Sequence, residues 1–162
     1  MPESNNYKFN HLKIHTQYSI CEGAIKISSL KDFCKEKKIA SVGLSDTSNL
    51  CGALEFSENI SKVGTQPIIG TQINFKFEDT IGLLPLFALN ENGYKKIIEL
   101  SSKSYLENES LSEPHLNINE LYKNIDGLLL FSGTSYGLFG KLFEKGRFDE
   151  ITKIYEKLSS TF

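Results

Sequence analysis

Three ionisable side chains recur at every second position near the start of the chain: His11, Lys13 and His15. Alternate residues of an extended strand share one face, so these three would line one surface while Leu12 and Ile14 face the other way. The same alternation is typical of any half-exposed edge strand. The pattern therefore allows two interpretations: the wall of a site near the end of a strand, or an ordinary edge strand.

Two carboxylates could join His15 in such a site. Glu22 and Asp46 both follow predicted strands, and the carboxyl ends of parallel strands meet at one edge of a sheet. Imidazole and carboxylate groups suit a divalent metal or general acid–base catalysis. However, the ammonium group of Lys13 would repel a cation there. Because the three candidate ligands are widely separated in the sequence, they form no local metal-binding motif.

The elements that would position these residues alternate between strand and helix. Strands are predicted at residues 9–15, 40–46 and 67–75, and the helices between them begin near Ser28 and Asn49. This order is typical of right-handed βαβ units and a parallel sheet. An open doubly wound sheet and a barrel both satisfy it, and both bind ligands at the carboxyl ends of their strands.

The second half of the chain is less regular. Pro85 interrupts the apolar segment 83–89 and places it at a sheet edge or in a hairpin. A helix is predicted from Asn90, and residues 127–133 are typical of a buried strand. A final amphipathic helix carries an apolar face: Phe148, Ile151, Tyr155, Leu158 and Phe162. That face must pack on something, so we expect a single, incomplete domain over residues 1–162.

Composition narrows the classes of function. The 162 residues are 40% hydrophobic, which is enough to bury a core. The net charge is −2, and Arg147 is the one arginine among 18 basic residues, so direct DNA binding is not expected. The sequence has no long apolar run and no signal-like N-terminus, which predicts a cytoplasmic protein without membrane contact. Its three cysteines lack the C-x-x-C spacing of a zinc or redox site.

A glycine-rich segment at residues 133–141 has some features of a phosphate-binding loop. Ser135 stands where that loop needs glycine, and Leu142 stands where it needs a hydroxyl group for the metal. We therefore predict an ordinary turn between a strand and a helix.

Several blocks of the sequence together resemble the polymerase-and-histidinol-phosphatase (PHP) domain. They are most similar to its version at the N-terminus of the bacterial replicative DNA polymerase III alpha subunit. The blocks are residues 11–19 (HLKIHTQYS), 22–26 (EGAIK), 44–53 (LSDTSNLCGA), 67–70 (PIIG), 88–94 (ALNENGY) and 129–133 (LLFSG). The resemblance implies a distorted, TIM-barrel-like parallel (β/α)7 barrel, of which this chain would be the N-terminal part.

The resemblance also identifies metal-site positions. In PHP domains that bind metal, the first strand carries His-x-His, and further ligands follow the next strands. The positions that depart from this pattern are Lys13, Thr47, Gln72 and Thr134, and those that keep a ligand type are His15, Glu22 and Asp46. Exchanging a neutral imidazole for ammonium adds repulsion toward a cation, and exchanging carboxylate for amide removes ligand charge. The resemblance thus implies a vestigial site without catalytic residues, and no cofactor beyond a weakly held divalent metal.

The implied function is part of DNA replication. The parent protein would be a DNA-directed DNA polymerase, a nucleotidyltransferase, whereas this segment alone would be inactive. Some similar alpha subunits use the domain as a platform, so the implied partners are the rest of the alpha subunit and the proofreading exonuclease. Two alternatives are an active metal-dependent phosphoesterase or pyrophosphatase and a free-standing module that binds replisome proteins.

Overall fold

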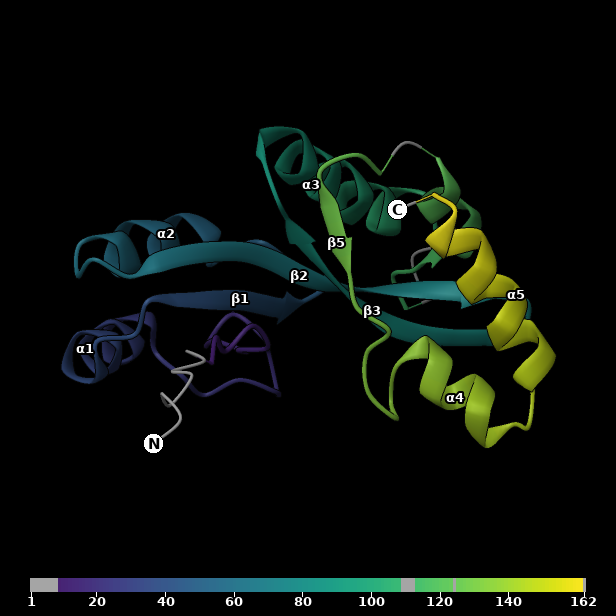
Figure 1. Cartoon of the computed structure of the whole chain (residues 1–162), viewed down its shortest axis with the longest axis horizontal. Coiled ribbons are helices and arrows are strands. Elements are labelled where there is room, and N and C mark those ends of the chain that lie inside the picture. Colours follow the sequence, from purple (N-terminus) through teal and green to yellow (C-terminus); the bar gives the residue numbers. More distant parts are fainter. Residues whose placement is uncertain (1–8, 109–112, 124, 162) are drawn as a thin grey trace, which may run out of the picture.

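A computed structural model describes residues 9–108, 113–123 and 125–161 of the chain. It shows a mixed α/β fold in which one sheet runs along the molecule, with helices gathered at its two ends (Figure 1). In chain order the elements are α1 (Ile27–Lys37), β1 (Ser41–Thr47), α2 (Ala53–Ser61), β2 (Gln66–Phe77), β3 (Thr80–Ala88), α3 (Glu91–Leu106), β4 (Leu116–Asn117), the 3₁₀ helix η1 (Ile118–Tyr122), β5 (Leu128–Leu130), α4 (Leu138–Glu144) and α5 (Phe148–Ser159). Within the described ranges, every helix is too short or too polar to cross a membrane.

The sheet is mixed: the parallel pairing predicted for the first half is found between β1 and β2, but the sheet as a whole is not parallel. β2 pairs in parallel with β1 and with the short β4, whereas β3 is antiparallel to both of its neighbours, β2 and β5. A tight turn at Glu78 and Asp79 joins β2 to β3, and Glu78 has a positive φ of 51°. So short a connection permits only an antiparallel hairpin. The hairpin expected around Pro85 is confirmed, while the (β/α)7 barrel is not seen in this part of the chain.

The predicted first strand is an irregular segment beside β1. The carbonyl groups of His11 and Ile14 accept hydrogen bonds from β1 amides at 2.7 and 2.9 Å. Between them the amide of Ile14 turns back to the carbonyl of Leu12 at 3.2 Å, which breaks the strand alternation. As a result, Lys13 and His15 line one pocket while His11 lines another. The prediction that all three share a face is wrong.

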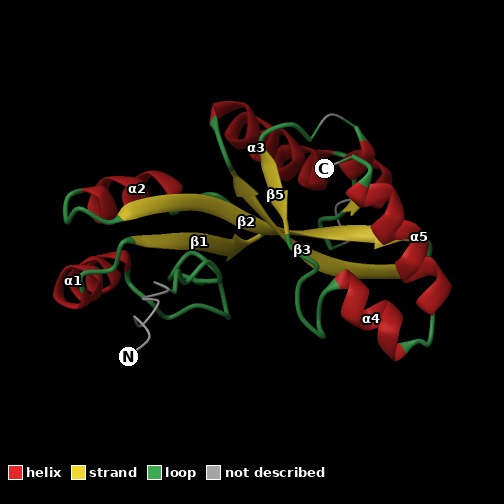
Figure 2. Cartoon of the chain, viewed as in Figure 1, coloured by secondary structure: helices red, strands yellow, loops and turns green. Residues whose placement is uncertain are grey.

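Two hydrophobic clusters hold the fold together. The helices that contribute to them are gathered toward the two ends of the sheet (Figure 2). The smaller joins α1, α2 and β1 around the fully buried Phe56. The larger packs α3, η1, α4 and α5 against the other strands, with Phe75 of β2 at its centre. Burial of these apolar side chains is the main driving force of folding.

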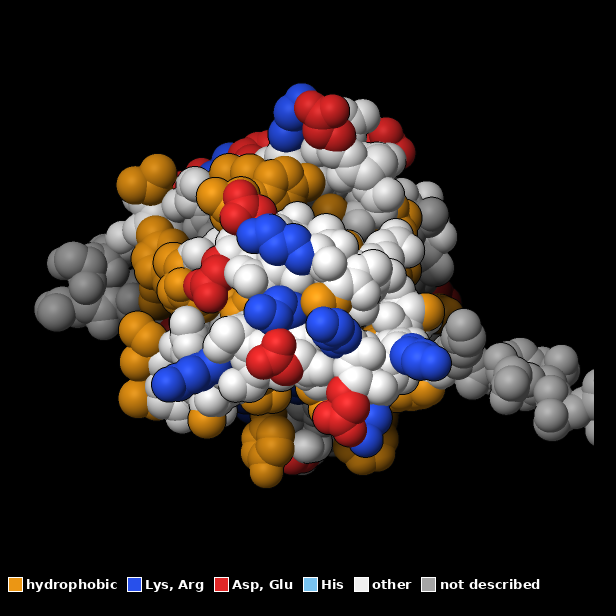
Figure 3. Space-filling view, turned by 90° about the vertical axis from the view of Figure 1, so that its left-hand side faces the viewer, with side chains coloured by type: hydrophobic (Ala, Val, Ile, Leu, Met, Phe, Trp, Pro, Cys, Tyr) orange, Lys and Arg blue, Asp and Glu red, His pale blue; other side chains and the backbone are white. Residues whose placement is uncertain are grey.

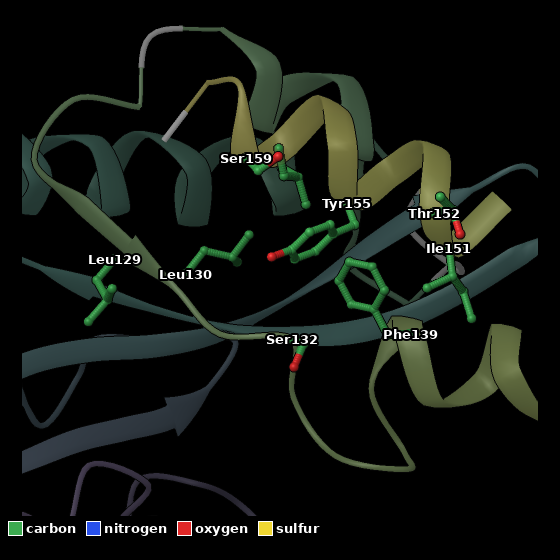
Figure 4. Close-up of a pocket in the computed structure, with 9 residues that line it drawn as sticks. Leu129, Leu130, Ser132, Phe139, Ile151, Thr152, Tyr155 and Ser159 are labelled. Carbon is green, nitrogen blue, oxygen red and sulfur yellow. The ribbon is translucent and has the colours of Figure 1, made fainter. Parts of the chain in front are cut away.

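An apolar groove of about 570 Å³ lies between β5 and α5. Tyr155 of α5 extends into this space, and in Figure 4 its ring lies between Leu130 and the ring of Phe139 of α4. The predicted apolar face of this helix is only partly covered, because Leu158 is buried while Tyr155 is 66% exposed. Phe162 lies outside the described residues. Among the described strands, β5 pairs on one side only, with β3. Within the described residues, the groove and this strand edge therefore form one continuous surface without a partner.

A cluster of charged side chains fastens α5 to the hairpin between β2 and β3. The guanidinium group of Arg147 pairs with Glu78 and Asp79 of the hairpin turn and with Glu150 of α5. The Lys145 ammonium also reaches Asp79 at 3.2 Å. Hydrogen bonds from Lys145 and Arg147 lower the pKa of Asp79 to about 2. The cluster holds the beginning of α5 in place over the sheet.

Candidate functional site

Five of the residues singled out in the sequence line one pocket of about 250 Å³: Lys13, His15, Glu22, Gln72 and Thr134. β2 supplies Gln72, the loop after β5 supplies Thr134, and the segment before α1 supplies the other three. The structure thus brings together positions that lie far apart in the sequence. Leu83, Tyr136 and Gly137 complete the wall; none was predicted as a site residue, because no pattern in the sequence marks them.

His15 is contacted through both of its ring nitrogens. Nδ1 lies 3.4 Å from Ser19 Oγ and 3.7 Å from Glu22 Oε2. Nε2 lies 3.3 Å from Gln72 Nε2. Both nitrogens are therefore engaged by the protein itself.

Thr47 connects the pocket to the end of β1. Its hydroxyl group lies 2.5 Å from Glu22 Oε2 and donates to it, and the threonine oxygen also receives Gln72 Nε2 at 3.3 Å. The Thr47 amide donates to Ser19 Oγ at 3.1 Å. Thr47 is thus a linking residue, bound to the carboxylate and the amide of the pocket.

Asp46 lies behind the pocket and is fully buried. Its Oδ1 accepts hydrogen bonds from the Thr16 amide at 2.6 Å and the Ser19 hydroxyl at 2.7 Å. Its Oδ2 accepts from the Thr16 hydroxyl at 2.7 Å. The carboxylate expected at a vestigial metal position therefore holds the turn at residues 16–19. Thr16 and Ser19 lie too far from Asp46 in the sequence for any local pattern to predict these hydrogen bonds.

Further contacts fix this turn from outside. Tyr18 donates its hydroxyl to Glu55 of α2 at 2.7 Å, and the bond and charge of that carboxylate raise the pKa of Tyr18. The Asn49 amide donates to the Tyr18 carbonyl at 3.0 Å. Gly23 passes so close to the turn that an added Cβ would lie 2.0 Å from the Thr16 carbonyl oxygen. The turn is consequently held at both ends.

The donor set of this pocket does not fit a metal cluster. In the part of the chain that the structure describes, no three His, Cys, Asp or Glu side chains are grouped to hold a metal ion. The two oxygens of Asp46 already accept three short hydrogen bonds. Lys13 brings a positive charge to the lining, and Gln72 presents N–H groups where a cation needs lone pairs.

Comparison with known proteins finds relatives whose alignments cover most or all of this chain. The DNA polymerase III alpha subunit of Caulobacter vibrioides is 33% identical over an alignment that covers 100% of this chain and 15% of that protein. The alpha subunit of Borreliella burgdorferi is 34% identical over 88% of this chain and 13% of its own length. The chain thus spans about one seventh of these relatives.

A solved structure from Bifidobacterium adolescentis, described as a metal-dependent phosphoesterase, superposes with a TM-score of 0.48 at 19% identity, over 59% of this chain and 32% of that one. So partial a likeness carries no argument about function. The family model for the PHP domain matches residues 11–162. This chain therefore belongs to the PHP domain family.

Proposed function

We propose that this chain acts as the N-terminal part of a cytoplasmic, replicative DNA polymerase III alpha subunit, as a structural and partner-binding domain without hydrolytic activity of its own. The observation that carries the proposal is that both carboxylate oxygens of Asp46 accept hydrogen bonds from the turn at residues 16–19. The similarity to DNA polymerase III alpha subunits over most or all of the chain supports the role in replication.

The purified protein is expected to hold no stoichiometric zinc or manganese and to hydrolyse no phosphoester or pyrophosphate above background. Elemental analysis and a phosphate-release assay measure both quantities. Two or more metal ions per chain would contradict the proposal. A variant with Lys13→His, Thr47→His and Gln72→Glu restores the ligand types and is the positive control, because it should gain affinity for these metals.

Electrostatics argues against a role in holding DNA. On the end of the molecule shown in Figure 3, lysine side chains are mixed with acidic ones and form no continuous basic stripe. Lys37 pairs with Glu36 at 2.7 Å, and on α3 Lys103 pairs with Glu99 at 2.9 Å. Lysines already paired with carboxylates release few counterions when they meet phosphate groups.

The groove between β5 and α5 is the surface that we assign to a partner. Among the described strands, β5 has one unpaired edge, which could pair with a further strand of the same alpha subunit. The apolar lining of the groove could pack against a further helix of that subunit. Relatives that are about seven times longer have the polypeptide to supply them. In this proposal, additional strands would continue the sheet toward a (β/α)7 barrel, and the proofreading exonuclease would bind elsewhere on the domain.

Binding measurements separate a protein partner from DNA. The purified chain is expected to bind the separately expressed remainder of the alpha subunit, and to bind the purified exonuclease, while showing negligible affinity for duplex or single-stranded DNA at physiological salt. Pull-downs with the purified proteins and a DNA titration across salt concentrations measure this. Tight DNA binding that weakens steeply with salt, together with no protein binding, would overturn the scaffold role.

A further inference from the structure

We propose that the side-chain amide of Gln72 takes the place of a metal ion, as the group that holds His15 and Thr47 together and, through the Thr47 hydroxyl, Glu22. This inference rests on the proposed function, in which the PHP pocket works without metal. The inference goes beyond that function by identifying Gln72 as the residue that compensates for the absence of a cation. The argument follows the direction of each hydrogen bond, beginning at the carboxylates, which can only accept.

The direction of the bonds around Ser19 places a proton on His15. The Ser19 hydroxyl donates its one proton to Asp46 at 2.7 Å, so its oxygen must accept from its other neighbours. Those neighbours are the Thr47 amide at 3.1 Å and His15 Nδ1 at 3.4 Å. Nδ1 also faces the Glu22 carboxylate at 3.7 Å, which likewise only accepts. Neutral His15 is therefore the tautomer with its proton on Nδ1.

His15 Nε2 then carries a bare lone pair, and the group opposite it is Gln72 Nε2 at 3.3 Å. The second N–H of the same amide points to Thr47 Oγ1, also at 3.3 Å. Thr47 has already committed its proton to Glu22 at 2.5 Å, so its oxygen is free to accept. The two protons of one amide thus satisfy two acceptors, an imidazole nitrogen and a hydroxyl oxygen.

A divalent cation would bind the same kinds of lone pair, but it would need negative ligands to offset its charge. The amide needs none. Gln72 is only 3% exposed and lies on the central strand β2, so its position is set by the sheet. Changing it to glutamate would turn two donors into acceptors and place a second carboxylate beside Glu22. Such a variant needs a cation, whereas the natural chain does not.

The first test is the tautomer of His15 in the unmodified protein. Nitrogen-15 NMR at alkaline pH, where imidazoles are neutral, is expected to show the Nδ1-protonated form for His15. The exposed His11 is the internal reference and should show the Nε2-protonated form that free histidine prefers. A Gln72→Met variant keeps the length of the side chain without its N–H groups, and it should move His15 toward the reference pattern. An Nε2-protonated His15 in the unmodified protein would overturn the inference.

The second test is thermal unfolding of four proteins with and without zinc or manganese: the unmodified chain, Gln72→Met, Gln72→Glu and Gln66→Glu. Gln66 is exposed at the start of β2, so its variant controls for the added charge. Both Gln72 variants should melt about 5 °C or more below the unmodified chain, since buried acceptors lose their donor. Metal should restore at least half of this loss in Gln72→Glu alone.

The outcomes separate this inference from the proposed function. Stabilisation of the unmodified chain by metal would refute the metal-free pocket and, with it, the inference. If metal leaves the unmodified chain unchanged while Gln72→Glu is as stable as that chain, the role of Gln72 fails and the proposed function stands.

Discussion

Replacing Asp46 with alanine is expected to lower the free energy of unfolding by about 2–4 kcal/mol. The carboxylate is fully buried and accepts three short hydrogen bonds, from the amide and hydroxyl of Thr16 and the hydroxyl of Ser19. Hydrogen bonds to a charged group are stronger than neutral ones, and a buried donor without an acceptor is costly. The loss should also loosen the whole turn that positions His15.

Urea unfolding followed by circular dichroism measures this change, and Asp32→Ala is the matched control. Asp32 is 74% exposed on α1, so its removal should change the stability by no more than about 0.5 kcal/mol. Asp46→Asn should fall between the two, because an amide keeps one acceptor oxygen. Equal stability of the Asp46 and Asp32 variants would show that the buried carboxylate does not hold the turn.

Changing Tyr155 to glutamate is expected to weaken binding of the remaining alpha subunit by about 30-fold or more, which corresponds to roughly 2 kcal/mol. Tyr155 is 66% exposed and lies in the middle of the groove beside Leu130 and Phe139. A charge there would have to be desolvated when the groove is covered. Because the side chain is mostly exposed, the variant should fold as the unmodified chain does.

Isothermal titration with the purified remainder of the alpha subunit measures this affinity. Leu54→Glu is the control, since Leu54 is 73% exposed on α2, at the other end of the sheet. The chain without its partner is also expected to self-associate through the uncovered groove, as sedimentation would show, and Tyr155→Glu should reduce this association. Unchanged affinity and a monodisperse, concentration-independent monomer would contradict the assigned surface.

Local patterns in the sequence predicted part of this structure correctly. The apolar, β-branched segment 67–75 lies within β2, and Asn90 caps α3 by accepting from the Gly93 amide at 3.0 Å. Both features depend on neighbours a few residues away, which a sequence pattern records. The gathering of Lys13, His15, Glu22, Gln72 and Thr134 in one pocket was expected from the family resemblance, because these positions follow the strands of one sheet.

Features that depend on distant partners were not predictable in the same way. The alternation around Leu12 indicated a regular strand, but the turn from Ile14 back to Leu12 ends it. The strand–helix–strand order of the first half favoured a parallel sheet, but the two-residue turn after β2 makes β3 antiparallel to it. Asp46 was correctly placed at the end of a strand, yet the direction of its carboxylate depends on Thr16 and Ser19, thirty and twenty-seven residues away.

The charge cluster around Arg147 bears on how the groove would be filled. Because Arg147 ties the hairpin turn to the start of α5, this helix is anchored over the sheet before any partner arrives. Because the walls of the groove are already ordered, binding of a partner costs less conformational entropy. Arg147 is not among the residues that line the groove, yet loosening its ion pairs would leave α5 to be ordered during binding. If the groove binds the partner proposed above, its affinity would therefore depend in part on preorganisation by ion pairs at the start of α5.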